Sequence, residues 1–288
     1  MAKSVIGIIK GGLGNQLFIY SACRALALRT GRDFYIDDRR GFTHDNYGRS
    51  YRLDRFPIMA KPMPEEWRLA PTLKHPLHKL IRNWNKLLPR NWRSYIAQRW
   101  NLPPSQLTAL NPCRKRITLN GYWANEEFFE EFSETIRTEL QPPTPADERN
   151  RELGKELERS GTVFVHARRV RYPTLLPAEY YRTALAGIRE KIPEPRFVVF
   201  SDDPGWIREN IDFGDSPVLW VEHNADDELA DLWLMSRCRH AIIANSSFSW
   251  WGAWLGGDPS DGRVIFTPEN PGWVIRPAKG WHRIPFEM

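Results

Sequence analysis

Three short apolar runs in the second half of the chain are each followed by polar residues of types that bind phosphates and nucleotides. The three groups are His166, Arg168 and Arg169, then Ser201, Asp202 and Asp203, and then Asn245, Ser246 and Ser247. The apolar Phe248 follows the third group and is a further candidate for donor binding. If the apolar runs are parallel strands, their carboxyl ends meet at one edge of a sheet, where open α/β sheets bind ligands. Arginine guanidinium groups bind phosphate through two parallel hydrogen bonds, and an aspartate can accept hydrogen bonds from a base or a ribose. The three groups together predict a nucleotide-diphosphate pocket.

Each group also has a purely structural explanation. Arg168 and Arg169 can be a pair of surface cations, and Asp202 and Asp203, which precede a proline, can cap a helix. The serine-rich turn can simply carry a helix that packs through its tryptophans. We favour the ligand site because the three groups follow predicted strands of one domain.

The stretch 241–256 illustrates the pattern best. Ala241 to Ala244 read as a buried strand, the small polar residues 245–249 as a helix cap, and Trp250 to Leu255 as an apolar helix that ends at Gly256-Gly257. A strand that enters a helix through such a turn leaves backbone N–H groups free at the positive end of the helix. These groups favour phosphate binding.

A glycine-rich loop lies near the N-terminus. An apolar run at 4–10 precedes Gly11-Gly12-Leu13-Gly14-Asn15-Gln16, and a helical pattern follows at 17–29. The order of strand, loop and helix is the opening of a Rossmann-like domain, although the loop matches neither the dinucleotide fingerprint nor a P-loop. Gly12, Gly14, Asn15 and Gln16 are candidate donor-binding residues, and an ordinary helix cap is the alternative.

A polar loop follows the second predicted strand, 34–36. It contains Asp37, Asp38, His44 and Asp45, and its place at the end of a strand makes these residues candidates for binding an acceptor substrate. A plain surface loop has the same composition.

A proline-rich stretch, residues 141–145, predicts a boundary between two domains. We expect an α/β fold with an acceptor-side Rossmann-like domain at 1–140, interrupted by a proline-rich basic insertion at 57–116, and a nucleotide-sugar-binding Rossmann-like domain at 146–288. Alternation of strands with helices favours parallel sheets in both. Further strands are predicted at 117–122, 162–165, 196–200, 218–221 and 241–244, and further helices at 126–140, 177–191, 206–211 and 226–237.

The composition of the 288 residues, with 41% hydrophobic and 26% charged, predicts a folded protein of one large or two ordinary domains. We find neither an apolar run long enough to cross a bilayer nor a signal-peptide cleavage pattern. The three cysteines are widely spaced and suggest neither a disulfide framework nor a metal cluster. We therefore expect a cytoplasmic protein.

The positive charge is confined to one region. The segment 61–116 holds 12 Lys or Arg and 2 Asp or Glu, whereas the whole chain has a net charge of +6. A nucleic-acid-binding function is therefore not favoured. Within this segment an apolar helical face with basic neighbours either covers the core or contacts an anionic membrane surface. Its residues are Leu77, Leu80, Ile81, Trp84, Leu87 and Leu88.

Four stretches together resemble the α-1,2-fucosyltransferase family, glycosyltransferase family 11, over nearly the whole chain. They are Gly-Gly-Leu-Gly-Asn-Gln-Leu-Phe at 11–18, Gly-Tyr-Trp at 121–123, Phe-Ser-Asp-Asp at 200–203, and Asn-Ser-Ser-Phe-Ser-Trp-Trp-Gly-Ala-Trp at 245–254. The last stretch is long and highly specific, and the residues 234–240 before it also match.

The resemblance implies a GT-B fold, in which two Rossmann-like domains face each other across a cleft. It implies inverting, metal-independent transfer of L-fucose from GDP-fucose to O2 of a galactoside, with no cofactor. The pyrophosphate-binding arginine of the wider superfamily corresponds to Arg168, which we expect to act with His166 and Arg169, and the guanine-contacting aspartate corresponds to Asp202 or Asp203. The implied partners are GDP-fucose and a galactose-containing glycan. A lipid-linked acceptor and peripheral contact with the inner membrane face are further expectations.

The chain departs from the family pattern after Arg169. The usual Gly-Asp-Tyr reads Val170-Arg171-Tyr172, so an arginine replaces an acid, and the usual Gly-Tyr-Phe-Gln reads Gly-Tyr-Trp-Ala at 121–124. Arg171 and Tyr172 are expected on the acceptor side. Three functions stay open: fucosyl transfer, transfer of another GDP-deoxysugar, and binding of GDP-sugar or glycan without catalysis.

Overall fold

The computed structural model describes residues 3–68, 80, 83–85, 87–89, 92–98, 107, 114–159, 161–170, 174–270 and 274–286. The chain divides into two compact units, Met1–Leu140 and Gln141–Met288, and each is described here by itself. The division falls at the start of the proline-rich stretch. None of the helices in the described ranges combines the length and the apolar character needed to span a bilayer.

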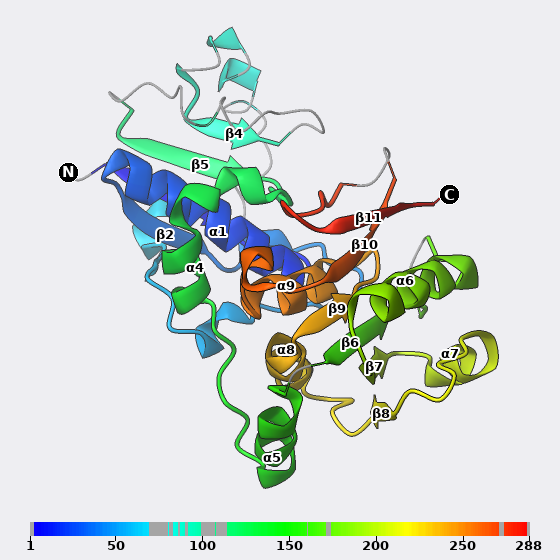
Figure 1. The fold of residues 1–288 in the computed structure, drawn as a ribbon. Coiled ribbons are helices and arrows are strands. Elements are labelled where there is room, and N and C mark those ends of the chain that lie inside the picture. The colour runs from blue at the N-terminus through cyan, green and yellow to red at the C-terminus, as the bar shows by residue number, and fades with distance from the viewer. Residues whose placement is uncertain are drawn as a thin grey trace. The chain divides into compact units, whose positions relative to one another are not determined.

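The first unit is built on a five-stranded parallel sheet in the order β3-β2-β1-β5-β4 (Figure 1). Its strands are β1 (Ser4–Ile8), β2 (Asp33–Asp37), β3 (Lys61–Pro62), β4 (Tyr95–Ala97) and β5 (Arg116–Asn120), and its α-helices include α1 (Leu13–Thr30) and α4 (Ser133–Glu139). The short strands β3 and β4 were not predicted, because both lie in the proline-rich insertion and have no apolar run of their own.

The helix α1 is buried on nearly all sides and packs against the sheet (Figure 1). A side chain at Gly7 would collide with Cys23, so the glycine in β1 lets the helix approach the strand closely. Gly31 ends the helix in the left-handed conformation, with φ of 61°. The helix begins four residues earlier than predicted, because Gly12 takes the N-cap position and the helix includes residues that were assigned to the loop.

The predicted helix at 126–140 is only partly present. Residues Glu126–Phe128 and Glu130–Phe132 form 3₁₀ turns, and only Ser133–Glu139 is α-helical. Two consecutive phenylalanines cause the difference: Phe128 packs on Trp123 and Phe129 on Phe18, and both are buried.

Much of the basic insertion lies outside the described residues. On its predicted apolar helical face, Leu80, Trp84 and Leu87 are exposed and Leu88 is half-buried. Leu77 and Ile81 lie outside the described residues. The described members of this face therefore do not cover the core of the first unit.

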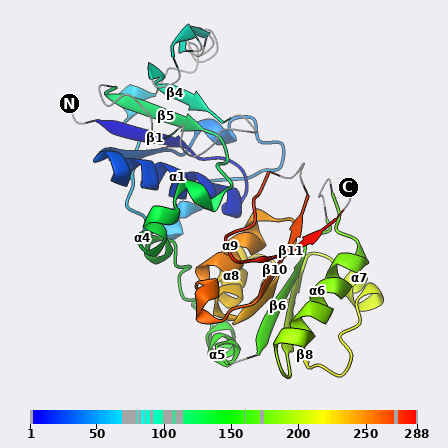
Figure 2. The ribbon, with the colours of Figure 1, turned by 45° about the horizontal axis from the view of Figure 1, so that its top comes forward.

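The second unit is built on a six-stranded parallel sheet in the order β11-β10-β9-β6-β7-β8 (Figure 2). Its strands are β6 (Thr162–Ala167), β7 (Arg196–Ser201), β8 (Val218–Val221), β9 (His240–Ile242), β10 (Ile265–Glu269) and β11 (His282–Pro285). Its helices are α5 (Glu148–Leu157), α6 (Ala178–Lys191), α7 (Pro204–Asn210), α8 (Glu228–Arg237) and α9 (Ser247–Leu255). The strands β10 and β11 come after the last strand predicted from the sequence. They were not predicted, and they extend the sheet at one edge.

Helices cover both faces of this sheet. The helix α6 lies on one face, where Tyr180, Leu185 and Ile188 pack with Val163 and Val199 in one apolar core (Figure 2). The helices α8 and α9 pack together on the other face, where a side chain at Gly252 of α9 would collide with Met235 of α8. Because helices cover both faces, the central residues of β6, β7 and β9 are apolar and buried, as in other parallel sheets.

Candidate functional site

The order of the second sheet reverses at β6, the first strand of this unit. β6 pairs with β7 up to Ala167 and Ser201, and with β9 up to Val165 and Ile242. A ligand crevice is expected outside the carboxyl ends of the strands at such a reversal. Adjacent strands lie about 4.8 Å apart, so the segments 166–170 and 243–247 leave the sheet as close neighbours. The structure thus brings the predicted polar groups to one edge of one sheet.

Asp202 fixes the loop that follows β6. Its Oδ1 accepts a hydrogen bond from the Arg169 N–H (2.7 Å), and its Oδ2 accepts one from the Val170 N–H (3.1 Å). The same Oδ2 lies 3.1 Å from Nη1 of Arg168. The side chain of Asp202 is only 21% exposed, and that of Arg168 is 45% exposed. Asp202 therefore positions the arginine loop in this structure, and its contact with guanine stays a prediction.

Arg169 has a supporting position in this structure. Its guanidinium lies 3.5 Å from the ring centroid of Trp206 in α7, and its Nη1 donates a hydrogen bond to the Leu176 carbonyl oxygen (3.0 Å). Arg169 therefore ties the loop to α7, and Arg168 is the more accessible guanidinium of the two. The joint action of the two arginines stays a prediction. The sequence did not indicate Trp206 as the partner of Arg169.

Ser201 and Asp203 also serve local structure. The Ser201 hydroxyl donates to the Ala167 carbonyl oxygen and accepts from the Asp203 N–H, both at 3.0 Å. Asp203 Oδ1 accepts from the Trp206 N–H (3.1 Å) and caps α7, which has Pro204 in its first turn. Asp203 therefore acts as the helix cap that the sequence offered as an alternative, and its contact with guanine stays a prediction.

The turn before α9 is shaped by its own polar side chains. Ser246 caps α9 and accepts from the Phe248 N–H (3.3 Å), and the Ser249 hydroxyl accepts from the Ala244 N–H (3.2 Å). Asn245 Nδ2 donates to the Thr174 carbonyl oxygen (2.9 Å). Ser247 is half-buried, and its hydroxyl has no hydrogen-bond partner among the described residues. Ser247 and the positive start of the helix can therefore face an anion.

His166 connects the end of β6 with the start of α9. Its ring lies 6.0 Å from the ring of Phe248, measured between centroids, and the residue is 6% exposed. Burial, together with the charge of Arg168, lowers the pKa of His166 to about 3. Its buried Nδ1 has no hydrogen-bond partner in the described part of the chain. At neutral pH the ring is uncharged, so it can form a hydrogen bond but is a poor proton acceptor.

The protein is expected to lose stability as the pH falls from 7 towards 4, in part because of His166. The unfolded chain takes up a proton near the ordinary pKa of 6.5, whereas the folded chain does so only near pH 3. The free energy of unfolding therefore does not depend on His166 protonation above pH 6.5, where the ring is neutral in both states. Below that pH it falls by about 1.4 kcal/mol per pH unit for one histidine. Urea denaturation at pH 7, 6 and 5 measures this slope. His166→Asn should reduce this slope by the amount that corresponds to one proton. Equal slopes in the variant and the wild-type protein contradict the assignment.

The predicted donor-binding residues of the first unit occupy different environments. Gly12 is the N-cap of α1, with open space where a side chain would project, and Asn15 is half-buried in the first turn. Gly14 is buried inside the helix. Gln16 is 0% exposed, and its amide donates to the carbonyl oxygens of Gly11 and Ser50 and accepts from the Arg52 N–H. Gln16 therefore holds the neighbouring loop, and its contact with a ligand stays a prediction.

The two aspartates after β2 are engaged within the protein. Asp37 is buried, and its Oδ1 accepts from the Arg40 N–H (3.1 Å) and lies 3.4 Å from Nη1 of Arg68. Asp38 binds Nη2 of the same arginine at 2.7 Å. Both carboxylates are therefore held by Arg68 in this structure, and their acceptor-side role stays a prediction. His44 is exposed in the following loop, and Arg171 and Tyr172 lie outside the described residues.

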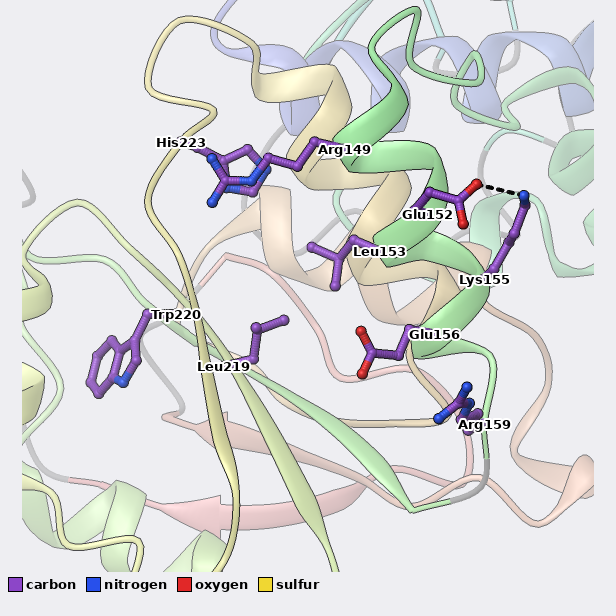
Figure 3. Close-up of a pocket in the computed structure, with 9 residues that line it drawn as sticks. All are labelled: Arg149, Glu152, Leu153, Lys155, Glu156, Arg159, Leu219, Trp220 and His223. Atoms are coloured by element: carbon purple, nitrogen blue, oxygen red, sulfur yellow. Dashed lines mark hydrogen bonds and ion pairs between the residues drawn. The ribbon is translucent and has the colours of Figure 1, made fainter.

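A groove of about 660 Å³ lies between α5 and β8 in the second unit (Figure 3). Figure 3 shows Arg149 and His223 beside each other at one end, with Leu153 and Leu219 between the helix and the strand. None of its lining residues belongs to the three polar groups. In the ranges that the structure covers, no cluster of three His, Cys, Asp or Glu residues could hold a metal ion.

The family model described as "Glycosyl transferase family 11" matches residues 4–271. The chain belongs to glycosyl transferase family 11. Among its relatives, an alpha-1,2-colitosyltransferase of Escherichia coli is 30% identical over 268 residues, which is 87% of each chain. The O-antigen biosynthesis glycosyltransferase WbnK of Escherichia coli is 28% identical over 291 residues, 91% of this chain and 93% of the relative. Galactoside alpha-(1,2)-fucosyltransferase 1 of Alouatta belzebul is 31% identical over 192 residues, 55% of this chain and 52% of the relative.

Solved structures show what fold this glycosyl transferase has. NodZ alpha-1,6-fucosyltransferase, co-crystallized with GDP, superposes with a TM-score of 0.52 at 14% identity over 88% of this chain and 92% of NodZ. A mutant of Arabidopsis thaliana FUT1 in complex with GDP gives a TM-score of 0.50 at 13% identity, over 94% of this chain and 71% of FUT1. At such identities the likeness concerns the fold alone. The fold is α/β of the GT-B type, with two Rossmann-like units that are each built on a parallel sheet.

Proposed function

We propose that this glycosyl transferase is an inverting enzyme that moves L-fucose from GDP-fucose to O2 of a galactoside in a glycan. One relative is named as a galactoside alpha-(1,2)-fucosyltransferase, and two proteins of the same fold were crystallised with GDP. The observation that carries the proposal is the position of Arg168. It stands at the reversal of the second sheet, next to the segment that leads into α9.

In the proposed reaction the galactose O2 attacks the anomeric carbon of fucose. The new C–O bond forms on the side opposite the bond to the β-phosphate oxygen, which breaks, and the proton of O2 is released. Negative charge grows on the β-phosphate as GDP leaves. Arg168 and the start of α9 stabilise this charge, which is often the largest contribution to such a rate. These groups would do so without a metal ion.

The buried histidine has a positioning role in this proposal. With a pKa near 3, His166 is a weak base at neutral pH, and a general base works best when its pKa is near the operating pH. Its ring contact with Phe248 holds the start of α9 against β6. The group that accepts the proton of O2 is therefore a residue other than His166, or water.

A second candidate donor is another GDP-linked deoxysugar. A relative that covers most of the chain is named for colitose, and the acid of the family pattern is replaced by Arg171. Loss of catalysis with retained binding is the third candidate. The proposed place of the protein is the cytoplasm, with a lipid-linked acceptor at the inner membrane face.

Titration with nucleotides in the presence of EDTA tests the donor part of the proposal. We expect GDP and GDP-fucose to bind at least 10-fold more tightly than UDP, and GDP release from GDP-fucose to accelerate when a galactoside is added. Transfer from GDP-colitose and not from GDP-fucose would select the second candidate. Donor binding without release across a panel of galactosides would select the third, and failure to bind GDP would reject all of them.

A further inference from the structure

A second cluster of polar residues lies at the carboxyl end of the first sheet. The strand order reverses between β1 and β5 (Figure 2), so a crevice is expected at their carboxyl ends. Lys10 follows β1 by two residues, Asn120 ends β5, and Tyr95 begins the neighbouring β4. The sequence prediction had placed Lys10 inside a strand and did not consider it as a binding residue.

The cluster is linked by short contacts. Lys10 Nζ donates to Asn120 Oδ1 (2.8 Å), and Asn120 Nδ2 donates to Tyr95 Oη (2.6 Å). The ammonium of Lys10 lies 5.0 Å from the ring centroid of Tyr122, and the guanidinium of Arg40 lies 5.5 Å from that of Tyr95. All five residues are half-buried, so a ligand can reach them.

The two cations of this cluster have no negatively charged partner in the part of the chain that the structure describes. No carboxylate of the described residues lies within 4.0 Å of Lys10 Nζ or of the Arg40 guanidinium. Burial lowers the pKa of Lys10, and the loop at Gly41 contributes to this burial because it packs against Ile9 and the Lys10 side chain. A partly desolvated cation without a counter-charge is costly, and an anionic ligand would offset this cost.

Two other cations of the same unit provide a comparison. Lys61 lies over the ring of Tyr35 (5.7 Å) and is paired with Asp33 at 3.1 Å. Arg49 lies over the ring of Tyr47 (4.4 Å) and is 4.0 Å from Asp45. Contact with a tyrosine is therefore shared by all four cations, whereas Lys10 and Arg40 alone among these four have no carboxylate neighbour.

We propose that Lys10 and Arg40 bind an oxyanion of the acceptor, a carboxylate or a phosphate, beside a sugar ring that contacts Tyr95 and Tyr122. Charge-assisted hydrogen bonds from both cations supply the affinity for the anion. Lys10 has three donors and uses one for Asn120, so two remain for the ligand. The inference rests on the proposed function, because it names the chemical class of the acceptor.

Three matched probes test the inference by isothermal titration calorimetry. They are the methyl glycoside of Galβ1-3GlcNAc, the diphosphate ester of the same disaccharide with a short alkanol, and the methyl glycoside of Galβ1-3GlcA. We expect the protein to bind one of the two acidic probes at least 10-fold more tightly than the neutral one. The stronger acidic probe identifies the source of the anion, a lipid-type diphosphate or an acidic sugar.

Substitutions separate this site from the donor site. Lys10→Met and Arg40→Met are each expected to reduce the preference for the acidic probe to less than 3-fold, and to change the Kd of GDP by less than 3-fold. The matched controls Lys61→Met and Arg49→Met should keep the full preference. The preference is a ratio of affinities, so a general loss of folded protein does not produce the expected result.

The inference is overturned if the protein binds acidic and neutral probes equally or binds none of them. It is also overturned if both variants keep the preference, or if they weaken GDP binding in its place. The proposed function fails separately: an acidic preference that depends on Lys10, in a protein that transfers no sugar, supports this site and rejects fucosyl transfer.

Discussion

Arg168→Ala is expected to lower the rate of sugar transfer by a factor of about 100 to 1,000, because removal of one donor to a developing oxyanion has this effect in other enzymes. Arg168 is the more accessible guanidinium of its loop, and its side chain is 45% exposed. Its loss leaves the two backbone hydrogen bonds of Asp202 in place. The fold should therefore survive, and the GDP-release assay measures the loss of rate directly.

Two further variants make this result interpretable. Arg168→Lys keeps the positive charge but cannot form the two parallel hydrogen bonds of a guanidinium, so we expect an intermediate rate. Arg182→Ala removes an arginine of α6 whose side chain is 57% exposed and pairs with Glu179, and the rate should stay within 2-fold of wild type. Near-normal turnover of Arg168→Ala, with unchanged thermal stability, would refute the role assigned to Arg168.

Asp202→Ala is expected to weaken binding of GDP at least 10-fold and to lower turnover with it. The variant loses the hydrogen bonds to the backbone of Arg169 and Val170 and the ion pair with Arg168. The loop then loses its fixed conformation, and ordering it on binding costs free energy. Asp202→Asn keeps one acceptor oxygen and should show a smaller effect.

A base analogue distinguishes positioning from direct recognition of guanine. Inosine diphosphate lacks the 2-amino group of guanine, with which a carboxylate would form a hydrogen bond. If Asp202 acts only through the loop, Asp202→Ala should weaken GDP and inosine diphosphate by the same factor. A selective loss of GDP affinity would show that Asp202 contacts the base. Asp203→Ala is the control: it removes the cap of α7, which costs about 1 kcal/mol of stability, and should change the affinity of GDP by less than 3-fold.

The sequence was sufficient to predict the structural features that depend on residues close together in the chain. Apolar runs of four or five residues that end in polar groups indicated β6, β7 and β9, and the parallel pairing then put these ends at one edge. The turn before α9 was also indicated, because small polar residues precede an apolar helix there. The four stretches of family resemblance agree with the family model that matches the chain.

The uses of individual side chains could not be predicted, because they depend on partners far away in the sequence. In the sequence, Asp37 and Asp38 have no visible partner. In the structure both form ion pairs with Arg68, which lies about 30 residues further along the chain. Gln16 holds a loop at residues 50–52, and Lys10 meets Asn120 across 110 residues. A sequence shows which residues can form hydrogen bonds, and the fold decides which of them are used within the protein.

A crystal structure of the protein with GDP, grown with EDTA, tests the central claim most directly. The expected result places the β-phosphate oxygens about 3 Å from the Arg168 guanidinium and from the Ser247 N–H or hydroxyl, at hydrogen-bond distance. A diphosphate bound elsewhere in the second unit, with Arg168 still directed only at Asp202, would contradict the claim.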